Sequence, residues 1–143
     1  MAEKTRKFLI ATHGAFAQGI KSSLDIIVGA IENVFIIQAY LDENKPIEEE
    51  LDQVARQSDP EDEWVIFTDL LGGSITNQIL RHSLGQRAQI VAGFNLPLLL
   101  EVLMADTSTP LQEILETAIT QAREQLVHVN KLLTANHNEP AND

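Results

Sequence analysis

One stretch near the start of the chain decides the fold: Phe8-Leu9-Ile10-Ala11-Thr12-His13-Gly14. Its apolar run has the length of a buried strand and stops at a polar residue and a glycine, which mark a turn. From Ala15 to Val28 the apolar residues then recur at helical spacing, at Phe16, Ile20, Leu24, Ile27 and Val28. The stretch therefore predicts a strand, a turn and a helix.

The same pattern of strand and helix repeats along the chain. Further buried strands are predicted over Asn33–Tyr40, Trp64–Thr68 and Ala88–Ala92. Helices are predicted from Pro46, over Ile75–Leu84 with Ser74 as N-cap and Gly85 as its end, over Leu98–Met104, and from Pro110 to at least Gln125. This alternation predicts an α/β fold, with a doubly wound, mostly parallel sheet in the order 2-1-3-4 and helices on both faces.

Two segments at the C-terminal end lack a clear pattern of either helix or strand. The stretch Leu126–Leu133 can extend the last helix or, because Val127 and Val129 alternate with polar residues, form a further strand. Thr134–Asp143 is polar and contains a proline, which predicts a disordered tail. We therefore expect one domain over residues 1–133.

Composition limits the classes of protein to which the chain can belong. Its 143 residues and 44% hydrophobic content suit one domain with a continuous core, and the absence of cysteine excludes disulfides, zinc ribbons and thiol catalysis. A net charge of −11 argues against a nucleic-acid partner. No signal peptide is visible, and no apolar stretch approaches the ~20 residues of a membrane helix. We expect a cytoplasmic protein.

Polar residues follow the first and third predicted strands, where a doubly wound sheet binds its ligands. His13 follows the first strand, and Asp69 and Gly72-Gly73-Ser74 follow the third. Neighbouring strands are only ~4.8 Å apart, so these groups can meet. A carboxylate on one ring nitrogen of His13 would set the tautomer and leave the other nitrogen as a nucleophile. Ser74, with backbone amides freed by Gly14 and Gly73 at helix N-termini, could bind phosphoryl oxygens, without a cofactor or metal.

Each of these residues also has a purely structural interpretation. His13 can be a turn or cap residue, and Asp69 and Ser74 can be loop and N-cap residues. A Ser-His-Asp hydrolase is disfavoured because Ser74 does not lie in a Gly-x-Ser-x-Gly turn, and a nucleotide site because no Walker loop follows the glycines. A phosphoryl carrier and a non-catalytic flavodoxin-like module that binds a small anion both stay open at this point.

At these residues the sequence resembles the IIA component of the mannose family of the bacterial sugar phosphotransferase system. Three motifs carry the resemblance in the family's order and spacing: Ala11-Thr12-His13-Gly14, Thr68-Asp69-Leu70-Leu71-Gly72-Gly73-Ser74 and Ala92-Gly93-Phe94-Asn95-Leu96-Pro97. The resemblance covers about Phe8 to Leu133. One departure is Leu71, since the family often has an aromatic residue before the double glycine.

The resemblance implies that His13 accepts a phosphoryl group from the carrier HPr and passes it to a IIB component, which phosphorylates sugar entering through the membrane components IIC and IID. Asp69 would hold Nδ1, Nε2 would be the nucleophile, and Ser74 would contact the phosphoryl group. The resemblance also implies a homodimer, whose sheet can be completed by an exchanged antiparallel strand such as Leu126–Leu133. A related carrier for dihydroxyacetone kinase or a transcriptional regulator would use the same histidine with another acceptor.

Overall fold

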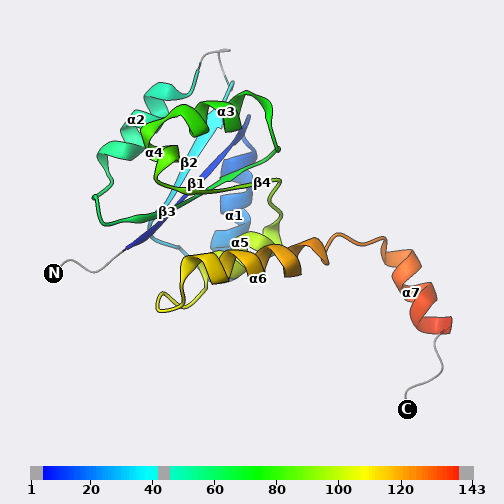
Figure 1. The fold of residues 1–143 in the computed structure, drawn as a ribbon. Helices are drawn as coiled ribbons and strands as arrows, with labels where there is room; N and C mark the ends of the chain where they lie inside the picture. The colour runs from blue at the N-terminus through cyan, green and yellow to red at the C-terminus, as the bar shows by residue number, and fades with distance from the viewer. Residues whose placement is uncertain (1–4, 42–45, 139–143) are drawn as a thin grey trace.

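A parallel sheet organises the residues that the computed structural model describes, which are 5–41 and 46–138. Its four strands lie in the order β2-β1-β3-β4, and each neighbouring pair is parallel (Figure 1). The strands are β1 (Arg6–His13), β2 (Val34–Ala39), β3 (Glu63–Thr68) and β4 (Gln89–Ala92). The predicted α/β class and strand order are confirmed.

Helices cover both faces of this sheet (Figure 1). One face packs against α1 (Phe16–Val28), α5 (Leu96–Leu103) and α6 (Leu111–Arg123). The other face packs against α2 (Glu48–Arg56), α3 (Gly73–Arg81) and α4 (Ser83–Gln86). Among the described residues, none of the helices has the length and apolar character to cross a membrane.

The burial of strand β1 on both faces explains why its sequence is continuously apolar. Phe8 and Ile10 belong to the core on the α1 side, whereas Leu9 and Ala11 belong to the core on the α2 side. Successive side chains of a strand point to opposite faces, so a strand buried on both faces needs an apolar residue at every position. The strand therefore runs through the centre of the protein and ends at the sheet edge where His13 lies.

Arg6 fastens the amino end of the sheet to the loop between α5 and α6. Its Nε donates to Glu63 Oε1 at 3.2 Å, which links the first residues of β1 and β3. The same guanidinium donates to the carbonyl oxygens of Asp106 and Thr109. Three segments far apart in the sequence are thus held by one side chain.

A buried ion pair is formed by the residues next to Arg6 and Glu63 in the sequence. Lys7 Nζ is 2.8 Å from Asp62 Oδ2, and the two side chains are 13% and 4% exposed. Burial alone would raise the pKa of Asp62, but hydrogen bonds from Lys7 and from the Asp59 amide, together with the nearby Arg87 charge, hold that pKa below its ordinary value of 3.8. Arg87 also donates to the carbonyl oxygens of Asp59, Pro60 and Asp62.

Helix α3 begins at Gly73, earlier than the sequence predicts. Its N-cap is Gly72, so Ser74 lies within the first turn and the prediction that Ser74 caps the helix is wrong. Gly72 and Gly73 have φ angles of 75° and 77°, in the left-handed region that glycine adopts without strain. The two glycines thus turn the chain into the helix without a capping side chain.

The end of α3 also differs from the prediction. The helix stops at Arg81, because His82 has an extended backbone and serves as the N-cap of α4. Gly85, predicted to end α3, lies inside α4 instead. A Cβ there would stand 1.8 Å from the Ile79 carbonyl oxygen, so the glycine allows α4 to pack closely on α3.

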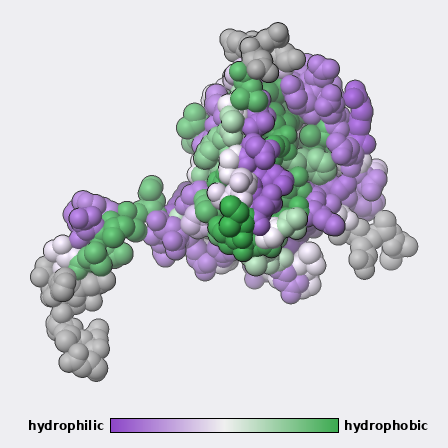
Figure 2. Space-filling model, turned by 180° about the vertical axis from the view of Figure 1, so that it is seen from behind, coloured by the Kyte–Doolittle hydropathy of each residue, from purple (hydrophilic) through white to green (hydrophobic). Residues whose placement is uncertain are grey.

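The C-terminal region is helical and projects from the domain. Helix α7 (Val129–Asn138) follows α6, so the described part of Leu126–Leu133 contains no strand. Helix α7 also includes residues 134–138, where the sequence predicts a tail, because no glycine or proline interrupts it; residues 139–143 lie outside the described residues. Side chains 123–135 are all exposed, and α7 stands apart from the sheet and its helices (Figures 1 and 2).

Candidate active site

His13 and Asp69 meet at the carboxyl end of the sheet. His13 is the last residue of β1, and Asp69 directly follows the neighbouring strand β3. Asp69 Oδ2 lies 2.9 Å from His13 Nδ1 and accepts the backbone N–H of His13 at 3.0 Å. The predicted contact of Asp69 with Nδ1 is therefore present, and the same oxygen also holds the backbone.

This contact sets the tautomer of the neutral imidazole. A carboxylate oxygen can only accept, so Nδ1 carries the proton and Nε2 keeps its lone pair. The His13 side chain is 44% exposed and that of Asp69 only 11%. Asp69 Oδ1 is buried and has no hydrogen-bond partner among the described residues. The pair thus combines a half-exposed imidazole with a largely buried carboxylate.

The N-terminus of α3 offers hydrogen-bond donors at the same end of the sheet. The amides of Gly73 and Ser74 have no acceptor within residues 5–41 and 46–138, as expected for the first turn of a helix. The Ser74 side chain is exposed. Free amides at a helix N-terminus favour an anion, so this end of α3 has the donors that an anion requires.

Gly14 differs from Gly73 in this respect. Its amide donates to the Ala39 carbonyl oxygen at 2.8 Å, and Thr12 Oγ1 accepts the Ala17 amide at 2.8 Å. Both contacts satisfy donors near the start of α1. The amide of Gly14 itself is therefore occupied, because it continues the pairing of β1 with β2. That the turn at Gly14 frees other amides at the start of α1 for a phosphoryl group stays a prediction.

Tyr40 and Gln78 join this site, and the sequence interpretation missed both. The Tyr40 ring lies 5.9 Å from the His13 ring, and its hydroxyl is 2.6 Å from Ser74 Oγ. Gln78 Nε2 donates to the Tyr40 oxygen at 3.2 Å. A usable signal was present, since Tyr40 follows β2 and therefore lies at the same sheet end as His13.

Large apolar side chains are exposed close to the pair in sequence. Leu70 and Leu71, which follow Asp69 in the β3–α3 loop, are 59% and 89% exposed. Phe16 at the start of α1 is 49% exposed and stacks on Phe94 with ring centroids 5.4 Å apart. Exposed apolar groups beside a polar site are typical of a protein-docking surface.

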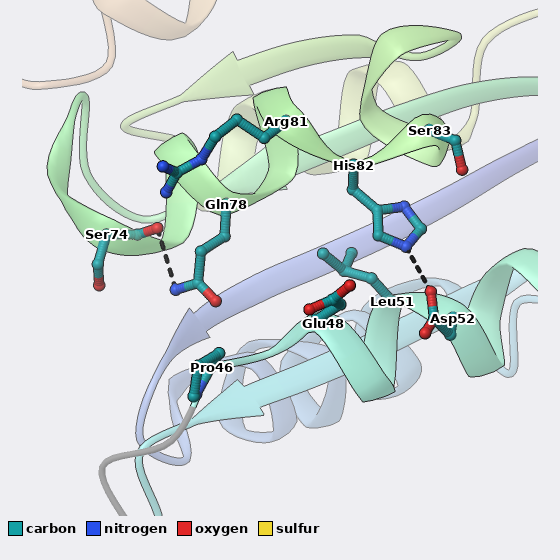
Figure 3. A pocket seen from close by; sticks show the side chains of 9 residues that line it. All are labelled: Pro46, Glu48, Leu51, Asp52, Ser74, Gln78, Arg81, His82 and Ser83. Carbon is teal, nitrogen blue, oxygen red and sulfur yellow. Dashed lines mark hydrogen bonds and ion pairs between the residues drawn. The ribbon is translucent and has the colours of Figure 1, made fainter.

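A pocket of about 660 Å³ lies between α2 and α3 and includes Ser74 on its wall (Figure 3). It contains a second histidine–aspartate pair, in which His82 Nε2 lies 2.7 Å from Asp52 Oδ1. His82 Nδ1 accepts the Leu84 amide at 3.0 Å, so both ring nitrogens are occupied and this histidine is structural. No group of three or more potential metal-ligating side chains occurs in the described part of the chain.

Comparison with known proteins assigns the chain to a family. Residues 7–119 match the protein family EIIA-man, described as "PTS system fructose IIA component". The chain belongs to this family. A relative of this EIIA-man chain is the fructose-specific EIIA component of the phosphotransferase system of Bacillus subtilis, which is 30% identical over 90% of this chain and 92% of its own length.

Solved structures agree with the EIIA-man assignment. The IIA protein associated with the fucose utilization operon of Streptococcus pneumoniae is 31% identical, with a TM-score of 0.76 over 93% of this chain and 99% of that protein. The mannose/sorbose-specific IIA subunit of Enterococcus faecalis shares the fold, with a TM-score of 0.72 over 87% and 93% of the two chains and 21% identity. The resemblance inferred from the three sequence motifs is confirmed.

Proposed function

We propose that His13 Nε2 accepts a phosphoryl group from phospho-HPr in the cytoplasm and passes it to a IIB component during sugar uptake. The observation that supports this proposal is the pairing of Asp69 Oδ2 with His13 Nδ1 beside a half-exposed ring. That pairing leaves Nε2 with a free lone pair on a half-exposed ring. EIIA-man membership supports a role in the phosphotransferase system.

The transfer exchanges one P–N bond for another. The lone pair of His13 Nε2 attacks phosphorus, the bond to the HPr histidine breaks, and its electron pair returns to that nitrogen. The positive charge that develops on the His13 ring is stabilised by the Asp69 carboxylate at 2.9 Å from Nδ1, which keeps its proton. Transfer to IIB is the same step in reverse, with a nucleophile of IIB as the acceptor.

The phosphoryl oxygens require donors while the group is transferred. The free amides of Gly73 and Ser74 and the exposed Ser74 hydroxyl supply them in our proposal. The exposed Leu70 and Phe16 would form the apolar part of the docking surface for HPr and IIB. The net charge of −11 would favour a partner with a basic face.

The test is phosphorylation by enzyme I, HPr and phosphoenolpyruvate. We expect an acid-labile, base-stable mass increase of about 80 Da, lost in His13→Ala and retained in the control His128→Ala, which removes a histidine from the exposed segment before α7. Phosphorylated protein should then lose its label on addition of a IIB component. A wild-type protein that takes no label under these conditions would refute the proposal.

We also propose that the protein is a homodimer in which the C-terminal segment of each copy covers the other. Strand β4 is an edge strand of the described sheet, and beside it lies a groove of about 590 Å³. The groove is lined largely by apolar side chains, including Leu71, Leu80, Ile90, Val91, Ile119 and Leu126. Helix α7 exposes Val129, Leu132 and Leu133 and stands apart from its own domain (Figure 2).

Sedimentation velocity tests the dimer. We expect a species of twice the chain mass of 15.9 kDa for the wild type and for Thr134→Ala, a polar control on α7. Replacing Leu132 and Leu133 together by aspartate should yield monomers, because charged side chains cannot enter an apolar groove without a large desolvation cost. A wild type that sediments as a monomer at micromolar concentration contradicts this proposal.

A further inference from the structure

We infer that Tyr40 is a positioning residue, which orients the Ser74 hydroxyl so that its proton points toward the phosphoryl group on His13. This inference rests on the proposed function and adds a residue that the three sequence motifs do not contain. It is carried by a chain of hydrogen bonds in which the first links have a fixed direction, and we assign the last, between Tyr40 and Ser74, from the donor strengths of the two hydroxyls. The chain runs from the Ile47 amide through Gln78 and Tyr40 to Ser74.

The first link fixes the orientation of the Gln78 amide. The backbone N–H of Ile47 can only donate, and it lies 2.8 Å from Gln78 Oε1. Nε2 therefore faces the other way, where it donates to the Ser74 carbonyl oxygen at 3.1 Å and to the Tyr40 oxygen at 3.2 Å. The side chain extends from α3 toward Ser74 and the segment at Pro46 (Figure 3).

The second link assigns the Tyr40 proton. Because the phenolic oxygen accepts from Gln78, its own O–H is free to donate, and Ser74 Oγ lies 2.6 Å away. A phenol is also a better donor than an aliphatic hydroxyl, since its pKa is about 10. Ser74 Oγ thus accepts from Tyr40, and the Ser74 proton is left for another acceptor. In a cooperative chain of this kind, each donated bond strengthens the next donor.

The backbone of Tyr40 provides a second, independent observation. Tyr40 has a φ of 60°, in the left-handed region that a bulky residue rarely adopts. Such a conformation costs of order 1 kcal/mol or more and persists where the surrounding structure requires it. Here it accompanies a ring that lies 5.9 Å from the His13 ring, with its hydroxyl on Ser74. A glycine or asparagine would relieve the strain but would remove the hydroxyl.

Single-turnover transfer from phospho-HPr tests the inference. Tyr40→Phe removes only the hydroxyl, and we expect the limiting rate constant to fall about tenfold, with the phospho-HPr concentration for half-maximal rate unchanged. Because Tyr40 acts through Ser74, Tyr40→Phe should have no further effect in a Ser74→Ala background. Thr120→Val, which deletes a hydroxyl on the exposed face of α6, should match the wild type.

Two kinetic results would overturn the inference: a Tyr40→Phe rate equal to that of the wild type, or a double variant in which both full losses multiply. A wild type that takes no label contradicts the proposed function instead. The hydrogen-bond chain can then still be tested in the unphosphorylated protein, because Tyr40 is the only tyrosine. With ¹³Cζ-labelled tyrosine, Ser74→Ala should shift the single NMR signal, and an unchanged signal would refute the Tyr40–Ser74 bond.

Discussion

The two ends of strands β1 and β3 carry opposite kinds of polar chemistry. At the amino end, Lys7 and Asp62 form a buried ion pair that the Asp59 amide also supports. At the carboxyl end, His13 is half-exposed and Asp69 keeps one buried oxygen without a partner among the described residues. The same pair of strands thus has one end whose charges are buried and paired, and one end with an exposed ring and an oxygen without a partner among the described residues.

The largest effect is expected at the carboxyl end, from Asp69→Asn. A neutral asparagine no longer enforces the tautomer of His13, because its amide has a donor as well as an acceptor, and it no longer stabilises the charged ring. We expect phosphoryl transfer to slow by about 10³-fold, with the free energy of unfolding lowered by no more than about 1 kcal/mol. Rapid-quench transfer and urea unfolding measure the two quantities. Equal transfer rates in the variant and the wild type would contradict the role of Asp69.

The reverse pattern is expected at the amino end, from Lys7→Met. The variant removes the Lys7 ammonium from the buried Asp62 carboxylate, and the nearby Arg87 charge replaces it only in part. The free energy of unfolding should therefore fall by about 3 kcal/mol, while the limiting transfer rate stays within twofold of the wild type. Lys21→Met is the matched control, because its pair with Asp25 lies on the surface of α1 at 3.0 Å. That control should cost less than about 0.5 kcal/mol. Similar losses in both variants would show that burial of the pair does not matter.

A smaller effect is expected in the pH dependence of stability. The pKa of Asp62 is lower in the folded protein than its ordinary value of 3.8, so its contribution is fully present above pH 3.8 and is lost as the pH falls through the lower folded pKa. Asp62→Asn should therefore flatten the decline of the free energy of unfolding at acid pH. Urea titrations of wild type and variant between pH 5 and 2 measure it, and parallel curves would exclude this contribution.

The smallest effect is expected from Arg6→Lys. Lysine keeps the charge beside Glu63, but it cannot also donate to the carbonyls of Asp106 and Thr109 as the planar guanidinium does. We expect the free energy of unfolding to fall by about 1 kcal/mol, with no change in transfer. A variant as stable as the wild type in urea unfolding would show that the two carbonyl contacts contribute nothing.

The sequence predicted the sheet well because its strands are buried on both faces. In a chain of this length, an apolar run such as Phe8–Ala11 is compatible with few structures other than a buried strand. The strand order follows from the usual connections of α/β folds. That order placed His13 beside Asp69. The helix boundaries were harder to predict, because Gly72 and Gly73 start α3 through their φ angles, which composition does not reveal.

The part of the site that sequence reasoning missed depends on side chains that meet only in three dimensions. Tyr40 reaches Ser74 because its backbone adopts a left-handed φ, which no sequence pattern of tyrosine indicates. The amide of Gly14 is occupied because the β1–β2 pairing continues one residue beyond the strands. The sequence of Leu126–Leu133 is compatible with helix or strand, and the polar residues 134–138 predict a tail where the structure continues α7.

One oxygen of Asp69 holds the ring and the backbone of the same residue, His13. These two hydrogen bonds restrict the imidazole to one rotamer before any partner binds. The side-chain entropy of His13 is therefore already lost on folding. It also means that Nε2 can be approached from a single direction. Under the proposed function, the protein that delivers the phosphoryl group and the protein that removes it must occupy the same face in turn, and an excess of either should slow the relay by competition.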